Sequence, residues 1–470
     1  MESHQPTNGK INIIISKQDR ASQNIKNILL QIRDWVPIQV DSIEEITALE
    51  FKKFRLIEIE GLHIYQDGLD KRLAAWQLES EIIIFASKHR SKDGRRLLTV
   101  HPTGNTKEAK FGGNPMELAA AAPQAMRSIY SNLKTLTKNE DFQVSLESTH
   151  HGPSDLKIPS LFVAIGSSEK EWIDPLAGRI VANAILMIGD ENVPIAVGFG
   201  GNHYAPRQTK LIEDIEVTFG HIFPTYKLDD LNKDLIMQAF DRSCADFAYF
   251  DRKSMKARQR DRLSAIVESL GYEVLRESDI REMDGVPWQF CLQLREKVKD
   301  ICPTGRTHFT ESIKCEIQTA CQGCVCPKVK VATINPELLS EAEKLDRPRL
   351  EAFLEEHSIA YLEHKNGRFS HIIISLDDEC SRLVAEQLIN ECFNIVKEHY
   401  DVRYEKDEGI LYLISRKFSP ELAKEYGISS GPMFGTLAKG KSVTLNNRTI
   451  TPEMVFEKYE KAIRLKNINL

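Results

Sequence analysis

Two spacings of apolar residues alternate along residues 10–280. Short runs of β-branched and aromatic residues, each of strand length, are separated by segments whose apolar positions recur at helical spacing. Strands are predicted at Ile11–Ser16, Arg55–Ile59, Glu81–Ala86, Leu97–His101, Phe142–Ser148, Leu161–Gly166, Val193–Gly198, Asp246–Phe250 and Tyr272–Leu275, and helices at Ser22–Ile32, Pro115–Leu136, Ala177–Ile188 and Ser254–Leu270. This alternation favours crossover connections, so residues 1–283 are expected to form an α/β domain with a parallel or mixed sheet flanked by helices.

The pattern changes near residue 284. Residues 284–335 concentrate cysteine, proline and glycine with little periodicity, which predicts a Cys-rich connecting segment. Order returns over residues 336–470, where strands are predicted at His371–Leu376 and Gly409–Ser415 and a helix at Cys380–His399. A further helix followed by a glycine-rich loop is predicted over Glu421–Gly440. These features favour a smaller α+β domain.

Composition narrows the class of protein. The chain has 470 residues, enough for two or three domains that bury full cores. Its formal net charge is −6, so a polyanion would have to be bound by local basic patches. No run of apolar residues approaches the ~18 that a membrane-spanning helix needs. The N-terminus lacks the pattern of a secretory signal, so we expect a cytoplasmic protein with reduced cysteines and no membrane partner.

Histidines gather beside glycine, proline or serine where several predicted strands end. His150 and His151 follow one strand, and Glu147 precedes them. His203 and Tyr204 follow a strand that runs into Gly198, Gly200 and Gly201, and further histidines stand at His89, His101 and His221. In open α/β sheets ligands bind beyond the carboxyl ends of strands, so these side chains are expected to meet at one rim. Imidazole and carboxylate groups there could bind a divalent metal or act as general acid and base. For any single histidine, a surface-loop or packing role is the alternative.

The same blocks resemble a known family. LESTHHGPSD, VGFGGNHYAPRQT, FGHIFPTY, ASKHRSKDG, LTVHPTGN and GGNPMELAAAAPQAM are similar to the signature blocks of the archaeal and plant-type D-aminoacyl-tRNA deacylases, in that family's order. The resemblance covers roughly residues 10–275. It implies a fold related to peptidyl-tRNA hydrolases and nucleoside phosphorylases. It also implies hydrolysis of the ester between a D-amino acid and the 3′ end of tRNA, with two zinc ions per subunit.

The resemblance carries over to individual residues. It implies catalytic roles for Glu147, His150, His151 and His203, and metal ligation by His101, His150, His151, His203 and His221. It implies substrate binding by Lys17, Asp19, His89, Thr149, Gly200, Gly201, Tyr204 and Arg207. We expect a water activated by metal or imidazole to attack the aminoacyl carbonyl, with backbone N–H groups of Gly198–Gly201 holding the oxyanion. The alternatives are a peptidyl-tRNA hydrolase-like esterase, a phosphorylase-like enzyme, and a non-catalytic tRNA- or nucleotide-binding module. No obligate protein partner is indicated.

Two basic clusters are candidates for contact with tRNA, the first as a phosphate patch and the second, in a loop beside the expected site, for the acceptor end. One packs six basic residues into the eleven positions 252–262, and the other comprises Arg90, Lys92, Arg95 and Arg96. A solvated helix face is the alternative for the first.

Cysteines and a short motif mark the second half of the chain. Cys302, Cys315, Cys321, Cys324 and Cys326 lie within 25 residues, and the CxxCxC spacing suggests a structural zinc or iron–sulfur site, with free buried thiols as the alternative. Residues 425–452 are similar to a GPxxGxLxxG segment of ribonuclease Z-type tRNA-processing endonucleases. The HxHxDH signature of that family is absent, so nuclease activity is not implied, and the segment is expected to pack or to contact tRNA.

Overall fold

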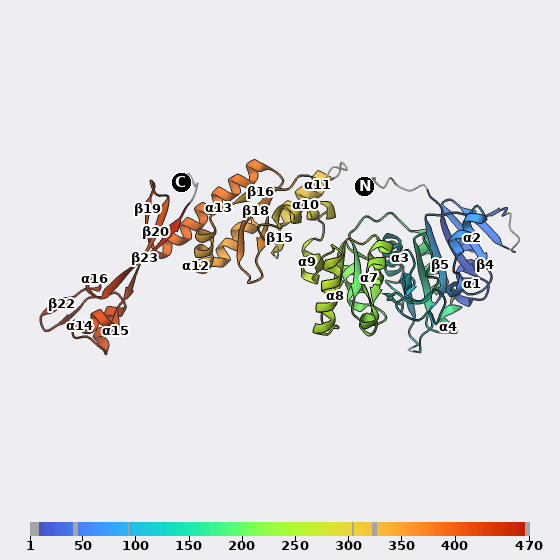
Figure 1. The fold of residues 1–470 in the computed structure, drawn as a ribbon, viewed down its shortest axis with the longest axis horizontal. Coiled ribbons are helices and arrows are strands. Elements are labelled where there is room, and N and C mark those ends of the chain that lie inside the picture. The colour runs from blue at the N-terminus through green and yellow to red at the C-terminus, as the bar shows by residue number, and fades with distance from the viewer. Residues whose placement is uncertain (1–8, 41–45, 93, 303–304, 322–326, 466–470) are drawn as a thin grey trace. The chain divides into compact units, whose positions relative to one another are not determined.

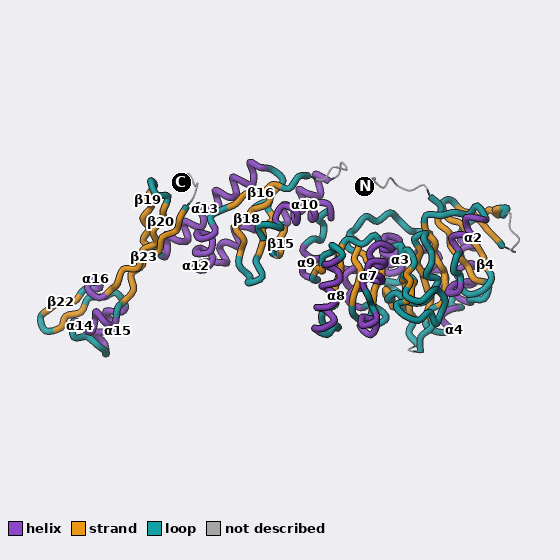
Figure 2. The backbone as a smooth tube through the Cα atoms, viewed as in Figure 1, coloured by secondary structure: helices purple, strands orange, loops and turns teal. Residues whose placement is uncertain are grey.

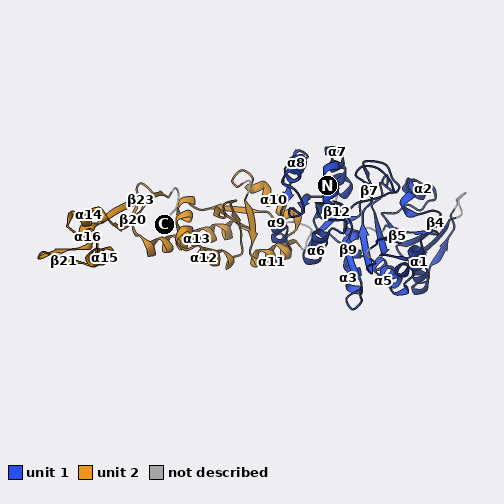
Figure 3. Cartoon of the chain, turned by 90° about the horizontal axis from the view of Figure 1, so that it is seen from below, with its two compact units in different colours: residues 1–284 blue, residues 285–470 orange. Residues whose placement is uncertain are grey.

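The computed structural model describes residues 9–40, 46–92, 94–302, 305–321 and 327–465. Contacts divide the chain into unit 1, Met1–Asp284, and unit 2, Gly285–Leu470 (Figure 3). Helices and strands alternate through unit 1 (Figure 1). In the part of the chain described, no helix is both long and apolar enough to cross a membrane.

Unit 1 contains a mixed sheet of eight strands. In spatial order these are β2 (Val36–Ile38), β3 (Thr47–Phe51), β4 (Phe54–Ile59), β1 (Ile11–Ser16), β5 (Ile82–Lys88), β10 (Ser160–Gly166), β6 (Leu97–His101) and β9 (Gln143–Leu146). The centre β4-β1-β5-β10 is parallel, whereas β6 runs antiparallel to β10 with His101 opposite Phe162. His101 therefore ends an antiparallel strand and lies beside Phe162 of β10, so it joins the other histidines from an antiparallel strand.

A second sheet completes unit 1. Its four parallel strands, in spatial order, are β12 (Thr218–Phe223), β11 (Ile195–Phe199), β13 (Phe247–Phe250) and β14 (Val274–Leu275). The two-residue strands β7 (Gly104–Asn105) and β8 (Glu117–Leu118) form a separate pair. The helices of unit 1 are α1 (Arg20–Ile32), α2 (Leu69–Ala75), α3 (Pro123–Leu136), α4 (Glu169–Trp172), α5 (Pro175–Leu186), α6 (Pro206–Asp214), α7 (Lys233–Ser243), α8 (Ala257–Ser269) and α9 (Glu277–Glu282), with 3₁₀ turns η1 (His63–Tyr65) and η2 (Thr225–Asp230).

The predicted helix Pro115–Leu136 begins later than expected. Helix α3 starts at Pro123, because proline lacks the N–H that a preceding turn would use and is favoured at the first helical position. The alanines before it are extended instead. Ala119, Ala120 and Ala121 donate backbone hydrogen bonds to residues far away in the sequence, the carbonyls of Thr103, Leu156 and Arg242.

Unit 2 is built on a four-stranded antiparallel sheet (Figure 2). Its strands, in spatial order, are β15 (Arg306–Phe309), β17 (Ala360–Glu363), β18 (Phe369–Ser375) and β16 (Lys330–Thr333). Residues 284–335 were expected to form a connecting segment with little regular structure. They instead contribute β15, β16 and the helices α10 (Trp288–Val298) and α11 (Glu311–Ala320) to unit 2. The sparse apolar pattern gave no signal for β15 and β16, because these short strands are stabilised by pairing with β17 and β18, which lie far away in the sequence.

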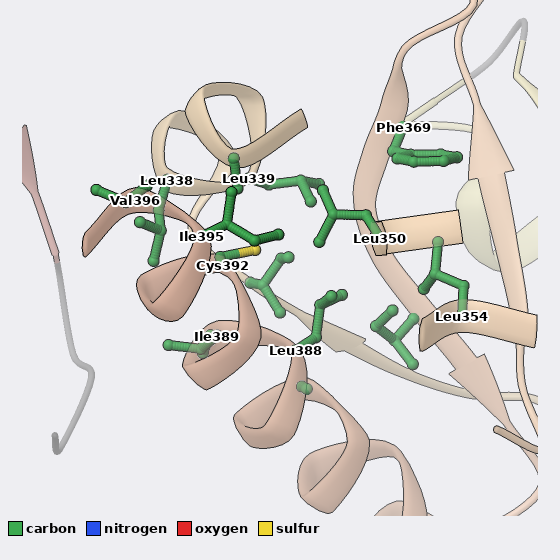
Figure 4. Close-up of a cluster of buried hydrophobic side chains, with 14 of the residues drawn as sticks. Leu338, Leu339, Leu350, Leu354, Phe369, Leu388, Ile389, Cys392, Ile395 and Val396 are labelled. Atoms are coloured by element: carbon green, nitrogen blue, oxygen red, sulfur yellow. The ribbon is translucent and has the colours of Figure 1, made fainter. Parts of the chain in front are cut away.

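Two long helices supply the core of unit 2. Leu338 and Leu339 of α12 (Pro336–Glu355) pack with Leu388 and Cys392 of α13 (Asp378–His399) (Figure 4). Strands β19 (Asp401–Glu405), β20 (Ile410–Phe418) and β23 (Phe456–Arg464) form another sheet. Between β20 and β23 lie α14 (Pro420–Glu425), α15 (Pro432–Ala438), the hairpin β21 (Val443–Leu445) and β22 (Arg448–Ile450), and α16 (Pro452–Val455). The helix expected at the start of Glu421–Gly440 corresponds to α14, whereas the stretch expected as a glycine-rich loop contains a second helix, α15, starting at Pro432.

Candidate active site

The Glu147 carboxylate is the centre of the site. It follows edge strand β9 and is fully buried. His89 Nδ1 lies 3.0 Å from Oε1, while His203 Nε2 and His150 Nε2 lie 3.1 and 3.4 Å from Oε2. Three imidazoles from loops far apart in the sequence therefore face one carboxylate, as the clustering of His with Glu147 predicted.

Backbone hydrogen bonds bring these loops together. The Ser148 N–H donates to the His203 carbonyl at 2.8 Å, and the Thr149 N–H donates to the Ile222 carbonyl at 2.8 Å. The chain leaving the edge of the eight-stranded sheet is thereby attached to β12 and to the loop after β11. The site lies where the two sheets of unit 1 adjoin.

A second group consists of His101, His150 and His151. Their ring centroids are 4.3 to 5.0 Å apart. Each Nδ1 lies against a backbone carbonyl, that of Pro102 at 3.1 Å for His101, Ser148 at 2.7 Å for His150 and Gly152 at 2.7 Å for His151. A carbonyl can only accept, so each Nδ1 carries the proton and each Nε2 keeps a lone pair, as metal-binding histidines require.

Burial fixes the charge states. Burial, followed by the neighbouring imidazoles, lowers the pKa of His101, His150 and His151 to about 3 from 6.5. Burial alone would raise the pKa of Glu147, but the imidazoles of His203 and His89, 3.1 and 3.0 Å from its oxygens, hold it well below 4.5. At neutral pH the three histidines are therefore uncharged and Glu147 is ionised.

These donors fit a divalent metal. Ligand atoms of His101, His150 and His151 lie within 4.8 Å of one another, as do those of His89, Glu147 and His203. Both Glu147 oxygens are buried, and within the described ranges neither has a hydrogen bond of good geometry despite the nearby imidazoles. Neutral imidazole and carboxylate are ligands that zinc takes.

His221 lies outside both groups. Its Nε2 is 3.0 Å from the Ala119 carbonyl, and its Nδ1 is 3.1 Å from the Thr149 hydroxyl. Both ring nitrogens are thus engaged by protein groups, and the expected metal ligand instead fixes Thr149. The sequence could not distinguish these roles, because the partner carbonyl is about a hundred residues away.

The predicted oxyanion donors are also occupied. Gly200 N–H donates to the Phe223 carbonyl at 2.8 Å, and Gly201 N–H donates to Ser254 Oγ at 2.7 Å. Both glycines have positive φ, +97° and +88°, which a side chain would disfavour. They shape the loop that leads to His203 rather than offering those two N–H groups to a ligand.

Other residues predicted to bind substrate lie at the periphery or support the site. Asp19 caps α1 and also accepts a hydrogen bond from the Lys88 N–H at 3.1 Å, next to His89. Lys17 pairs with Glu60 at 2.6 Å. Arg207 pairs with Asp251 and Glu277.

Tyr204 is at the site, as predicted. Its hydroxyl lies 3.2 Å from His89 Nε2, and the Arg95 guanidinium lies 4.7 Å from its ring centroid. Arg96, of the same basic cluster, pairs with Asp174 at 2.7 Å.

The cysteine prediction concerns residues that the structure covers only in part. Cys324 and Cys326 lie outside the described residues. Cys315 is exposed, Cys321 is half-buried, and Cys302 Sγ lies 3.3 Å from His364 Nδ1. Among the described residues, no group that could hold a metal includes a cysteine.

One residue at the site was not singled out from the sequence. Tyr226 stands beside Ser148, the neighbour of Glu147, and is 63% exposed. The signal was present, because Tyr226 ends the FGHIFPTY block, but no spacing rule separates an exposed tyrosine from a packed one.

The α/β fold and a buried carboxylate ringed by histidines define a protein of the hydrolase type, with a centre suited to activating water. A family model described as D-aminoacyl-tRNA deacylase matches residues 76–275. A protein named D-aminoacyl-tRNA deacylase from Methanococcoides burtonii is 40% identical over 462 residues, which cover 97% of this chain and 96% of that protein. The chain therefore belongs to the D-aminoacyl-tRNA deacylase family.

Shorter proteins match as well. The D-aminoacyl-tRNA deacylase of Methanosarcina acetivorans is 53% identical over 284 residues, covering 59% of this chain and 96% of that protein. A crystal structure of a conserved protein of unknown function is 37% identical, with a TM-score of 0.55, and covers 58% of this chain and 96% of its own. Relatives matched almost completely by three-fifths of this chain have no room for both units.

Proposed function

We propose that this chain hydrolyses the ester bond of D-aminoacyl-tRNA, releasing the D-amino acid and tRNA. Membership of the family supports this activity. The observation that carries it is the buried Glu147 carboxylate with imidazole nitrogens from three loops within 3.4 Å. Such a group of side chains can orient and deprotonate water. A module that only binds phosphate would not need a buried carboxylate among histidines.

His101, His150 and His151 would hold a zinc ion. Their Nε2 lone pairs, fixed by the Nδ1 bonds to carbonyls, support this assignment. Bound zinc supplies a Lewis acid and lowers the pKa of an adjacent water to ~7. The second ion that the resemblance implies would need the His89, Glu147 and His203 group.

His203 and Glu147 would move the proton. Glu147 is ionised and stabilises an imidazolium at His203, so that ring can take the proton of the attacking water and return it to the leaving ribose hydroxyl. The His203 and His150 side chains are each 31% exposed while Glu147 is fully buried, so the ester would approach from the histidine side. Tyr204 would hold His89 in place. Measuring the zinc content per chain decides the role of His203 and Glu147. One ion per chain would leave both free to move the proton, whereas two ions would make them ligands of the second.

A direct assay tests the function. Purified protein is incubated with D- and L-aminoacyl-tRNA, with and without a chelator, beside a His150→Ala/His151→Ala variant. We expect selective release from the D-isomer, abolished by the chelator and reduced at least ~10³-fold in the variant. Equal release from both isomers would contradict chirality proofreading, and preferred cleavage of N-acylated aminoacyl-tRNA would favour the peptidyl-tRNA hydrolase-like alternative.

Two broader predictions go with this function. The first is a cytoplasmic site of action, because the proposed substrate, D-aminoacyl-tRNA, takes part in translation. The mixed sheet flanked by helices is compatible with the predicted relation to peptidyl-tRNA hydrolases and phosphorylases.

A further inference from the structure

An exposed aromatic residue, Tyr226, lies close to the site that Glu147 centres. Tyr226 is 63% exposed and lies at the start of η2, directly after β12. The preceding Thr225 N–H donates to the Gly201 carbonyl at 2.9 Å, which ties this turn to the loop carrying His203. The Tyr226 hydroxyl lies near the side chain of Ser148, the residue after Glu147. The backbone of this turn therefore holds Tyr226 close to the site while most of the residue faces solvent.

A basic segment is fastened to the same two turns. Ser254 Oγ accepts the Gly201 N–H at 2.7 Å and lies 3.1 Å from the Thr225 hydroxyl. Ser254 is flanked by exposed basic residues, namely Arg252, Lys253, Lys256 and Arg258. Across the described residues, no acidic side chain forms an ion pair with any of these four.

The rest of the basic run has another task. Arg260 Nη1 donates to the carbonyls of Arg252 and Met255 at 3.0 and 2.8 Å. Arg262 donates to the carbonyls of Leu228 and Leu231, at the end of η2. Two arginines thus hold together the turns that carry Tyr226 and the four outward cations. This differs from a uniformly solvated helix face.

We propose that Tyr226 and the cations Arg252, Lys253, Lys256 and Arg258 form a docking surface for the single-stranded 3′ end of an RNA. The inference rests on the proposed function, in which that end carries the ester to be cleaved. Single-stranded RNA is bound by stacking of bases on aromatic rings and by cations along the backbone. The Tyr226 ring stacks on a nucleobase next to the ester, and the cations bind the adjoining phosphates. The chain has a net charge of −6, so such a surface must be local.

Two substitutions of Tyr226 separate stacking from hydrogen bonding. Stacking contributes ~1–3 kcal/mol per base, so Tyr226→Ala should lower kcat/KM for D-aminoacyl-tRNA by ~5- to 150-fold. Tyr226→Phe keeps the ring, loses only the hydroxyl, and should stay within ~2-fold of wild type. An unaffected Ala variant, or a Phe variant as impaired as Ala, would overturn the stacking role.

The cations are tested by the binding of deacylated tRNA at several salt concentrations. Each lost phosphate contact lowers the slope of log K against log salt by ~0.7, so Arg252→Ala/Lys253→Ala/Lys256→Ala should lower it by ~2. The matched control is Lys71→Ala/Lys138→Ala/Arg179→Ala, which removes the same charge from exposed positions elsewhere in unit 1. An unchanged slope, or an equal fall in the control, would overturn the surface.

This binding assay needs no catalysis. A wild-type protein that binds tRNA through these residues but hydrolyses no D-aminoacyl-tRNA would support the surface and overturn the proposed function. Hydrolysis that is insensitive to both sets of substitutions would do the reverse.

Discussion

At the scale of single residues, Glu147 is the group on which the site depends most. Its carboxylate is faced by imidazoles rather than by lysine or arginine. A neutral residue of the same shape would remove the negative charge that the nitrogens of His89 and His203 face.

Glu147→Gln should therefore abolish most activity while preserving the fold. We expect kcat for D-aminoacyl-tRNA to fall ~10²- to 10³-fold, the size of effect seen when one electrostatic group is removed from an active site. Thermal unfolding should stay cooperative. The matched control is Glu140→Gln at an exposed position, and a Glu147→Gln enzyme with wild-type kcat would refute the central role.

His63 should make the protein sensitive to acid. Its burial lowers the pKa to about 4 from 6.5, and the neighbouring Asp19 only partly offsets this. Because the unfolded chain takes up the proton first, stability is complete above pH 6.5 and is lost as pH falls towards 4. The shift corresponds to about 3 kcal/mol.

Urea unfolding between pH 7 and 4 measures that loss. A His63→Gln variant keeps a donor for the Ile14 carbonyl, 3.1 Å from His63 Nε2, and should show a flatter pH dependence than wild type. Equal slopes for the two proteins would show that His63 does not titrate as its burial implies.

At the scale of elements, close packing of α7 on β12 positions one side of the site. A Cβ on Gly220 would lie 2.0 Å from Ser243 Oγ. That hydroxyl accepts the His221 N–H at 3.0 Å, and His221 holds Thr149. Glycine is thus needed here for the approach of a helix to a strand.

Gly220→Ala should lower the free energy of unfolding by ~1–3 kcal/mol, as overpacking of cores does. Gly189→Ala is the control, because its Cβ would meet nothing closer than Ser128 Oγ at 3.9 Å. Chemical denaturation of both variants gives the comparison. A Gly220→Ala protein as stable as the control would mean that α7 shifts without cost.

Much of the α/β pattern was predictable, since buried parallel strands such as β1, β5 and β10 are short apolar runs with clear ends. The edge strands and helix starts were less so. The start of α3 depends on where Ala119–Ala121 find hydrogen-bond partners, and β15 depends on pairing with β17. Both depend on interactions with residues far away in the sequence, which the local spacing of apolar residues does not reveal.

The site was predictable to the same extent. His101, His150, His151 and His203 were recognisable because they stand near glycine or proline at predicted strand ends, in blocks that resemble those of a known family. The difference between a ring facing Glu147, such as His89, and one saturated by the backbone, such as His221, is set by contacts that the sequence does not display.

At the scale of the whole molecule, all residues of the site lie in unit 1. Unit 2 has its own core around α12 and α13, and shorter relatives match only about three-fifths of this chain. Both observations favour units that fold separately.

A fragment of residues 1–284 should therefore fold and keep hydrolytic activity toward D-aminoacyl-tRNA, with kcat within a few-fold of the full chain. A fragment of residues 285–470 should show its own cooperative unfolding transition. Calorimetry and the ester assay measure these properties. An unfolded or inactive first fragment would show that catalysis needs unit 2.

Each of the three histidines that could bind a metal is held by a neighbouring backbone carbonyl. The residues that would activate water are therefore oriented independently of the side chains that would select the substrate. Main-chain carbonyl oxygens at positions 102, 148 and 152 fix the ring orientations of His101, His150 and His151. Side chains lining the approach can then be exchanged without turning the rings. Such an enzyme could be adapted, by evolution or by engineering, to a different acyl group while its water-activating machinery stays as it is.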